Sequence, residues 1–331
     1  MKVYFYIPFL LLFLISCKTK TEVKEGSLPN GAYFSQVADT TAQIFAEGIV
    51  SKAYQELNAV FSPDGKEFYY TVADPGRNFY AIMVYTQDEN EDWAGPEVAS
   101  FSGKFSDADP YITSDNKKLY FISQRPIDEM SIEKKDFDIW MVNRTETSWS
   151  DAIRLDTIIN TPKNEFYVSA TDDGSIFYSS NYENGLGYGD IYEARFEDGE
   201  YKVENLGDAI NSPTGEGDPY VSPDGNMIIF MGWGRKDDLG RGDLYISFKK
   251  DGVWQKAQNL GSRINSPSFE YCPMMSPDGK YFFWTSYRST PMENPEGYDY
   301  KSYIDRLENT DNGLGNIYWI DAAVLDEFKA N

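Results

Sequence analysis

The pattern of apolar and polar positions repeats five times along the chain. Each copy has a short apolar run, a turn of the Ser-Pro-Asp-Gly kind and an aromatic-rich run, which together are typical of a β-hairpin. The copies read FSPDGKEFYYT from Phe61, ITSDNKKLYFIS from Ile112, ATDDGSIFYSS from Ala170, VSPDGNMIIFMG from Val221 and MSPDGKYFFWTS from Met275. Self-similarity at a fixed period of roughly 50 residues indicates a repeat architecture.

Two further strands are predicted after each hairpin. A second shared pattern, Asp or Asn followed by an apolar and an aromatic residue, begins at Asn78, Asp138, Asp190, Asp243 and Asn316. A fourth strand is expected around Trp93, Trp149, Tyr201 and Trp254. Four short strands in a radially repeated unit predict an all-β fold, a five-bladed β-propeller.

The fifth unit lacks a fourth strand of its own. Residues Asp321 to Lys329 instead predict a short amphipathic helix. The segment from Ala42 to Ser51 precedes Glu56 just as the INSP-like segments precede the later units. We therefore expect this N-terminal segment to supply the outer strand of the last blade, which closes the ring and removes exposed sheet edges.

The hairpin motif resembles that of the TolB-like, WD-repeat-like propeller family, over residues 42–325. The resemblance implies the propeller fold and says little about function. TolB itself is described with six blades, so six blades are the alternative to the five counted here. The sialidase Asp-box places a residue between Asp and Gly, whereas Asp64 and Gly65 are adjacent, so a sialidase interpretation of these turns is rejected.

The first segment predicts export and lipid anchoring. Residues 1–16 contain one basic residue, Lys2, followed by an apolar run from Val3 to Ile15. This run is shorter than the about 20 residues of a membrane span and is typical of a signal peptide. The sequence Leu-Ile-Ser before Cys17 resembles the lipobox of bacterial lipoproteins. We therefore expect a lipidated Cys17, a flexible tether over residues 17–41 and a propeller domain over residues 42–331, anchored in the bacterial outer membrane on its periplasmic or cell-surface side.

Composition removes several function classes. The chain has no histidine, so Ser-His and Cys-His nucleophile pairs and histidine-based metal sites are excluded. Its 53 acidic and 30 basic residues give a net charge of -23, which disfavours nucleic acid and leaves the lipid as the expected membrane contact. With Cys17 lipidated, Cys272 is the remaining thiol and no intrachain disulfide is expected.

One acid recurs in every repeat, eight residues before the turn aspartate. These acids are Glu56, Asp107, Glu165, Glu216 and Glu270. If the innermost strands line the axis, the carboxylates form a ring at one mouth of the propeller, where calcium is a cation that such a ring would accept. The alternative is a structural contact that every blade makes, with Arg125 and Arg288 paired to the ring. No other cofactor is expected.

Residues that depart from the repeat are better candidates for function. Six residues before the turn aspartate the series reads Asn58, Asp109, Tyr167, Asp218 and Cys272. Asp109 and Asp218, together with Glu216, are candidates for the acid and base of a glycosidase, whose carboxylates lie about 5 to 9.5 Å apart.

The second candidate region is the insertion from Tyr287 to Gly315. Its side chains Arg288, Tyr298, Tyr300 and Tyr303 suit sugar stacking or protein contact, unless the loop folds back and buries them. These features favour a non-catalytic binding or scaffold protein of the cell envelope that holds a protein partner or a glycan at the loop-bearing mouth. The alternative function is a carboxylate-based, glycan-active enzyme with its site at the axis.

Overall fold

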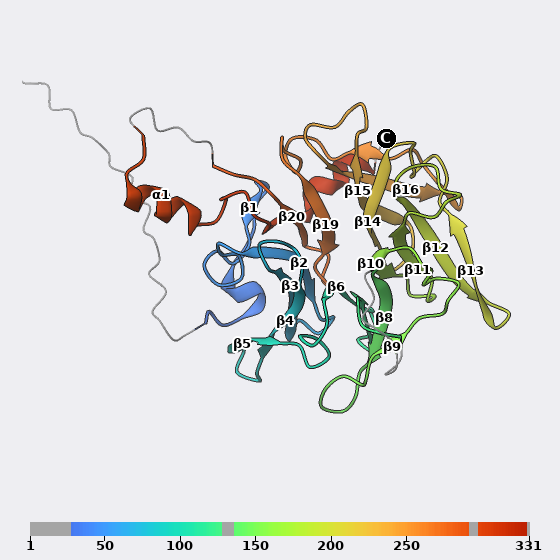
Figure 1. The fold of residues 1–331 in the computed structure, drawn as a ribbon, viewed down its shortest axis with the longest axis horizontal. Helices are drawn as coiled ribbons and strands as arrows, with labels where there is room; N and C mark the ends of the chain where they lie inside the picture. Colours follow the sequence, from blue (N-terminus) through green and yellow to red (C-terminus); the bar gives the residue numbers. More distant parts are fainter. Residues whose placement is uncertain (1–27, 128–135, 291–296, 330–331) are drawn as a thin grey trace, which may run out of the picture.

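The chain folds as five antiparallel sheets arranged in a ring (Figure 1). The structure is a computed structural model that describes residues 28–127, 136–290 and 297–329. The sequence prediction of an all-β, five-bladed β-propeller is confirmed. In the described part of the chain, no helix has the length and apolar character needed to cross a membrane.

The first two blades follow the predicted order of four consecutive strands, from the axis outward. Blade 1 contains β2 (Gln55–Phe61), β3 (Glu67–Ala73), β4 (Tyr80–Gln87) and β5 (Trp93–Val98). Blade 2 contains β6 (Asp107–Ile112), β7 (Lys118–Ser123), β8 (Asp138–Asn143) and β9 (Ile153–Arg154).

The next two blades repeat this order, with one variation. Blade 3 contains β10 (Glu165–Ala170), β11 (Ile176–Ser180), β12 (Asp190–Glu197) and β13 (Glu200–Asn205). In blade 4 the outer strand is divided in two, so the blade consists of β14 (Gly215–Val221), β15 (Met227–Trp233), β16 (Asp243–Lys250), β17 (Val253–Trp254) and β18 (Gln258–Asn259).

Blade 5 is completed from the N-terminal side of the chain, as predicted. It contains β19 (Glu270–Met275), β20 (Tyr281–Ser286) and β21 (Asn316–Asp321), and β1 (Gln43–Ile44) pairs with β21. The predicted C-terminal helix is present as a 3-10 helix, η2 (Ala322–Phe328), whose residues Val324 and Leu325 are buried in the core. The ring is therefore closed by hydrogen bonds between the two ends of the propeller.

The packed structure begins before the expected boundary at residue 42. A 3-10 turn, η1 (Ala32–Ser35), inserts Phe34 into the core, where its ring stacks on Trp93 with the centroids 4.6 Å apart. The Tyr33 hydroxyl donates to Asp278 at 2.9 Å. The predicted signal peptide and Cys17 lie outside the described residues.

The repeated turn motif has a local physical explanation. In the first copy, Asp64 Oδ1 accepts from the Ser62 hydroxyl at 2.5 Å and from the Lys66 amide at 3.1 Å. Gly65 adopts a left-handed φ of 72°, a conformation that glycine reaches without steric cost. All five turns lie at one end of the ring, so the opposite end carries the inter-blade connections and the loops between second and third strands. We call this opposite end the mouth.

Candidate functional site

A β-bulge interrupts each innermost strand at the same position. The residue at the bulge has a left-handed backbone in every blade, with φ between 47° and 56°, at Asn58, Asp109, Tyr167, Asp218 and Cys272. These are the five residues of the variable series found in the sequence. A bulge redirects a side chain and ends regular pairing, and here it brings side chains from different blades together at the axis.

Asp109, Asp218 and Cys272 meet at the axis. The Cys272 sulfur lies 4.0 Å from Asp109 Oδ1 and 3.7 Å from Asp218 Oδ2, and the Cys272 amide donates to Asp218 Oδ2 at 3.1 Å. Because both oxygens are this close to one sulfur, they are no more than about 8 Å apart, within the upper limit for paired glycosidase carboxylates. The sequence proposed this pair, and the structure places its members together.

Tyr167 closes the axis beside this pair. Its side chain is buried, and its hydroxyl reaches from blade 3 to blade 5, where it donates to the Pro273 carbonyl at 2.6 Å. In blade 1, the side-chain amide of Asn58 donates to the Pro110 carbonyl at 3.4 Å.

Burial raises the pKa of both axial carboxyls. For Asp109 the loss of solvation is the largest cause and the negative charge of Asp218 adds to it. For Asp218 the loss of solvation again raises the pKa, against the opposing effect of hydrogen bonds from Cys272. The nearby Arg77 guanidinium lowers both pKa values without reversing the shift. The pair therefore retains a proton at neutral pH.

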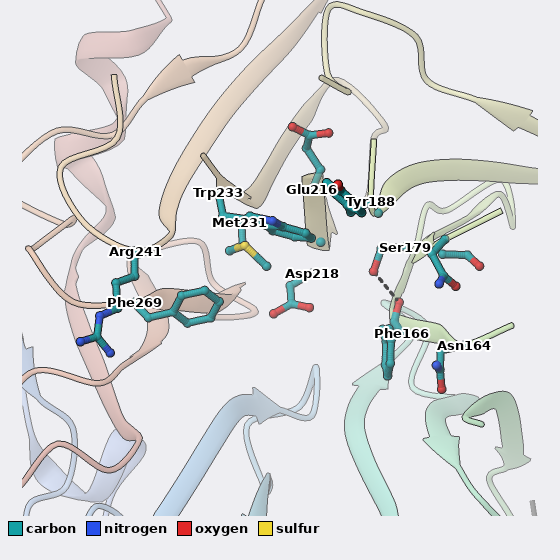
Figure 2. A pocket seen from close by; sticks show the side chains of 14 residues that line it. Asn164, Phe166, Ser179, Tyr188, Glu216, Asp218, Met231, Trp233, Arg241 and Phe269 are labelled. Carbon is teal, nitrogen blue, oxygen red and sulfur yellow. Dashed lines mark hydrogen bonds between the residues drawn. The ribbon is translucent and has the colours of Figure 1, made fainter. Parts of the chain in front are cut away.

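A pocket of about 560 Å³ opens above Asp218 at the mouth. Figure 2 shows the Asp218 carboxylate between the rings of Phe166 and Phe269, with Met231 and Trp233 beside it. The pocket also contains Tyr188, which is 82% exposed, and the amides of Asn164 and Asn181. A second pocket of about 230 Å³ reaches Asp109 and shares Phe166, Asp218, Met231 and Phe269 with the first. The two form one cleft, which we call the mouth cleft.

The five acids that recur in every repeat have a different environment. All five are buried, and four of them accept side-chain hydrogen bonds within their own blade or from the connection before it. Glu270, for example, accepts from the Ser266 hydroxyl at 2.5 Å, the Ser266 amide at 3.1 Å and the Ser286 hydroxyl at 2.8 Å. Glu165 likewise accepts from the Thr161 hydroxyl at 2.8 Å.

Arginines pair with three of these acids. Arg125 Nη2 lies 2.8 Å from Asp107 Oδ1, Arg235 Nη2 lies 2.7 Å from Glu216 Oε1, and Arg288 Nε lies 3.6 Å from Glu270 Oε1. The same three guanidinium groups also donate to backbone carbonyls at the end of the preceding connection, those of Phe101, Ile210 and Ile264. These contacts favour the structural interpretation of the acids. Glu216 also lines the larger pocket, but its carboxylate is paired with Arg235. The other two acids that line the mouth cleft are Asp109 and Asp218.

Glu56 differs from the other four. It receives a hydrogen bond from the Asn316 amide at 3.3 Å, and burial raises its pKa to about 7. Among the described residues, no three acidic, cysteine or histidine side chains are grouped so that they could hold a metal ion. Within this part of the chain the five recurrent acids therefore do not form the grouped calcium site that was one interpretation of the sequence.

The insertion in blade 5 does not bring its tyrosines to the cleft. Tyr300 begins a short helix, α1 (Tyr300–Leu307), which lies at the edge of the molecule (Figure 1), and its side chain is 84% exposed. Tyr298 and Tyr303 contact each other, with ring centroids 6.0 Å apart. None of the three lines the pockets described here.

The sequence did not single out the aromatic walls of the cleft. Phe269 directly precedes one recurrent acid and Phe166 directly follows another. At these two positions the other blades have different residues, so the same comparison that found Asp109 and Asp218 would have detected them.

The chain shows similarity to solved structures and to no family model or curated protein. A glycoside hydrolase aligns with a TM-score of 0.51 and 11% identity, over 90% of this chain and 91% of that one. A protein named as a TolB of Agrobacterium tumefaciens aligns with a TM-score of 0.46 and 19% identity, over 73% of each chain. An α-L-arabinofuranosidase of Lactobacillus brevis gives 0.46 and 14%, over 82% and 95%. At these identities the similarity concerns the β-propeller fold.

Proposed function

We propose that this protein binds a glycan in the mouth cleft and acts as a binding module of the bacterial cell envelope. The observation that supports this is the lining of the cleft, where aromatic rings surround a carboxylate and side-chain amides. The apolar faces of sugar rings pack on aromatic side chains, and their hydroxyls hydrogen-bond to carboxylates and amides. Phe166, Trp233 and Phe269 supply the rings, and Asp218 supplies the carboxylate.

Binding of oligosaccharides to the full-length protein in detergent tests this proposal. A glycan array gives candidates, and calorimetry then gives affinities. We expect Phe166→Ala and Trp233→Ala each to weaken binding at least about tenfold, as expected for anchors that stack on a ligand. Phe196→Ala is the matched control, because Phe196 is an exposed aromatic residue of the same blade outside the cleft. Equal effects of Phe166→Ala and Phe196→Ala would contradict the proposal.

A second candidate function, glycan hydrolysis, rests on the axial carboxyl pair. A protonated Asp109 beside Asp218 supplies a general acid and a carboxylate near a sugar-sized cleft. If the protein is such an enzyme, Asp109→Asn and Asp218→Asn abolish turnover of a bound oligosaccharide and leave the fold intact. If it is a binding module, the unaltered protein leaves the oligosaccharide uncleaved.

We also propose that Cys17 carries a lipid that anchors the propeller to the outer membrane. This proposal rests on the lipobox-like sequence. Cys17→Ser is expected to move the protein from the membrane to the soluble fraction, and mass spectrometry of the N-terminal peptide identifies the lipid. An envelope protein partner, the other occupant suggested by the sequence, would be recovered by crosslinking in intact cells and would be lost with Trp233→Ala.

A further inference from the structure

A third pocket, of about 1030 Å³, opens at the mouth between blade 5 and blade 1. Three arginines line it, Arg77, Arg241 and Arg288, together with the hydroxyl side chains of Ser266, Ser268, Ser289 and Thr290. The acid among its lining residues, Asp311, accepts a hydrogen bond from the Tyr318 hydroxyl. We call this site the arginine pocket. Its positive charge is unexpected in a chain with a net charge of -23.

Two of these arginines form no ion pair with a carboxylate in the described parts of the chain. Most of the other described arginines do form one, namely Arg125, Arg144, Arg154, Arg195, Arg235, Arg263 and Arg288. Arg77 lies near the axial carboxyls without an ion pair to either, and both arginines are exposed. In a chain with so many acids, two exposed arginines at one site, outside any ion pair among the described residues, favour an acidic ligand.

Local hydrogen bonds fix the loop that carries Arg77, and two tyrosine rings lie beside its guanidinium. Asp74 Oδ1 accepts from the amides of Asn78 at 2.6 Å and Phe79 at 3.2 Å, and the Asp74 carbonyl accepts from the Arg77 amide at 2.9 Å. The guanidinium carbon lies 5.5 Å from the centre of the Tyr287 ring and 5.9 Å from that of Tyr271. A group positioned in this way loses little conformational entropy when it binds a ligand.

Arg241 is placed by close packing of two loops. Its amide donates to the Ser268 carbonyl at 2.7 Å. A Cβ at the neighbouring Gly240 would lie 2.3 Å from the Ser266 carbonyl oxygen, so the absence of a side chain is what allows this approach. Figure 2 shows Arg241 on the far side of the Phe269 ring from Asp218.

The arginine pocket is continuous with the mouth cleft. Arg241 and Phe269 line both the arginine pocket and the 560 Å³ pocket, and Arg77 lines both the arginine pocket and the pocket that reaches Asp109. A ligand longer than one sugar would therefore extend from the aromatic walls to the arginines.

We propose that the arginine pocket binds the carboxylate of a uronic acid residue, so that the glycan held at the mouth is an acidic one. This inference rests on the proposed glycan-binding function and specifies its ligand class. Guanidinium groups form paired, charge-assisted hydrogen bonds with carboxylates, and the serine and threonine hydroxyls suit the remaining polar groups of a sugar. The acidic surface elsewhere repels a polyanion, which confines its binding to this site.

Paired ligands test the inference. Calorimetry compares a panel of uronate oligosaccharides with their carboxyl-reduced, neutral forms, using the full-length protein. We expect the acidic forms to bind about tenfold or more tightly than the neutral ones, and the difference to shrink as sodium chloride is raised, because salt screens the charges. Arg77→Gln and Arg241→Gln should each remove most of that difference, because each lowers the affinity for the acidic forms more than the affinity for the neutral forms.

Arg263→Gln provides the matched control, because Arg263 is ion-paired with Glu327 and lies outside the pocket. If neutral and acidic forms bind equally and the pocket variants behave like this control, the inference is overturned and glycan binding stands. If no saccharide of either kind binds to protein that is folded by circular dichroism, both the inference and the proposed function are overturned.

Discussion

Two sets of buried acids lie close together on the innermost strands and differ in almost every other respect. Glu216 and Asp218 are separated by one residue in β14. Glu216 accepts hydrogen bonds from Ser212 and Arg235 within its own part of the ring. Asp218, at the bulge, faces the axis. Its carboxylate lies near the Cys272 thiol, which also lies near the Asp109 carboxylate of blade 2.

This difference distinguishes acids that stabilise the fold from acids that we propose belong to a functional site. An acid that recurs in every blade, with donors that recur beside it, is explained by the architecture. The axial pair has no such explanation, since burial and mutual repulsion disfavour its charged form. Carboxyls that are buried at a cost in stability at one place in the ring support our proposal that the binding site lies there.

The largest expected effect comes from breaking a recurrent acid. Asp107→Ala leaves the Arg125 guanidinium without its partner at 2.8 Å and should lower the free energy of unfolding by about 3–5 kcal/mol, as for other buried pairs. Urea unfolding measures the change. Asp305→Ala, which removes an exposed pair with Lys301, should change stability by less than about 0.5 kcal/mol. Similar losses in both variants would contradict the assignment.

The axial pair should respond in the opposite direction. Asp109→Asn removes a buried carboxyl whose pKa is raised, and should increase the free energy of unfolding at pH 8 by about 1–3 kcal/mol. Burial and the Asp218 charge raise the pKa of Asp109 to about 8. The folded protein therefore keeps a proton that the unfolded chain has already lost above its own carboxyl pKa of about 3.9.

The sign of the pH dependence follows from this difference. Where the folded state binds more protons than the unfolded state, stability falls as pH rises. The unaltered protein should lose stability between about pH 4 and pH 8, and Asp109→Asn should lose less. Melting temperatures across this range measure both slopes. A steeper slope in the variant than in the unaltered protein would reject the raised pKa.

A smaller effect is expected from the tyrosine beside the pair. Tyr167→Phe deletes the hydroxyl that donates to the Pro273 carbonyl at 2.6 Å and should cost about 1 kcal/mol of stability. Ligand affinity should stay within about twofold, since Tyr167 does not line the mouth cleft. A large loss of affinity would mean that the bulge geometry depends on this bond.

The smallest effect is expected at the insertion. Tyr300→Ser alters a side chain that is 84% exposed and outside the cleft, so stability should change by less than about 0.5 kcal/mol. Glycan affinity should also be unchanged, as measured by calorimetry. A marked loss of affinity would move the site from the axis to α1.

The sequence predicted the blades because their signals are local. The aspartate and glycine of each turn, and the aspartate or asparagine that begins each third strand, act within a few residues of themselves. The partners of the recurrent acids were harder to assign, because one donor to Glu216, Ser212, precedes it in the sequence and another, Arg235, follows it in a later loop.

The site was only partly predictable for a similar reason. Asp109 and Asp218 were found because they depart from the repeat. The bulge that turns them toward Cys272 could not be recognised from the pattern of apolar and polar residues. Arg77 and Arg241 lie in loops of unequal length, and their proximity to Phe269 depends on how the ring closes. Within the insertion, Arg288 lines the arginine pocket, whereas Tyr298, Tyr300 and Tyr303 line none of the pockets described above.

The pairing of β1 with β21 also has a consequence for folding. Gln43 and Trp319 are partners across almost the whole described chain, so a contact of very large sequence separation completes the last sheet. Such contacts have a large loop-closure entropy and make folding slow. A chain whose last strands have not yet formed therefore leaves β1 unpaired, and the ring closes when β1 pairs with β21.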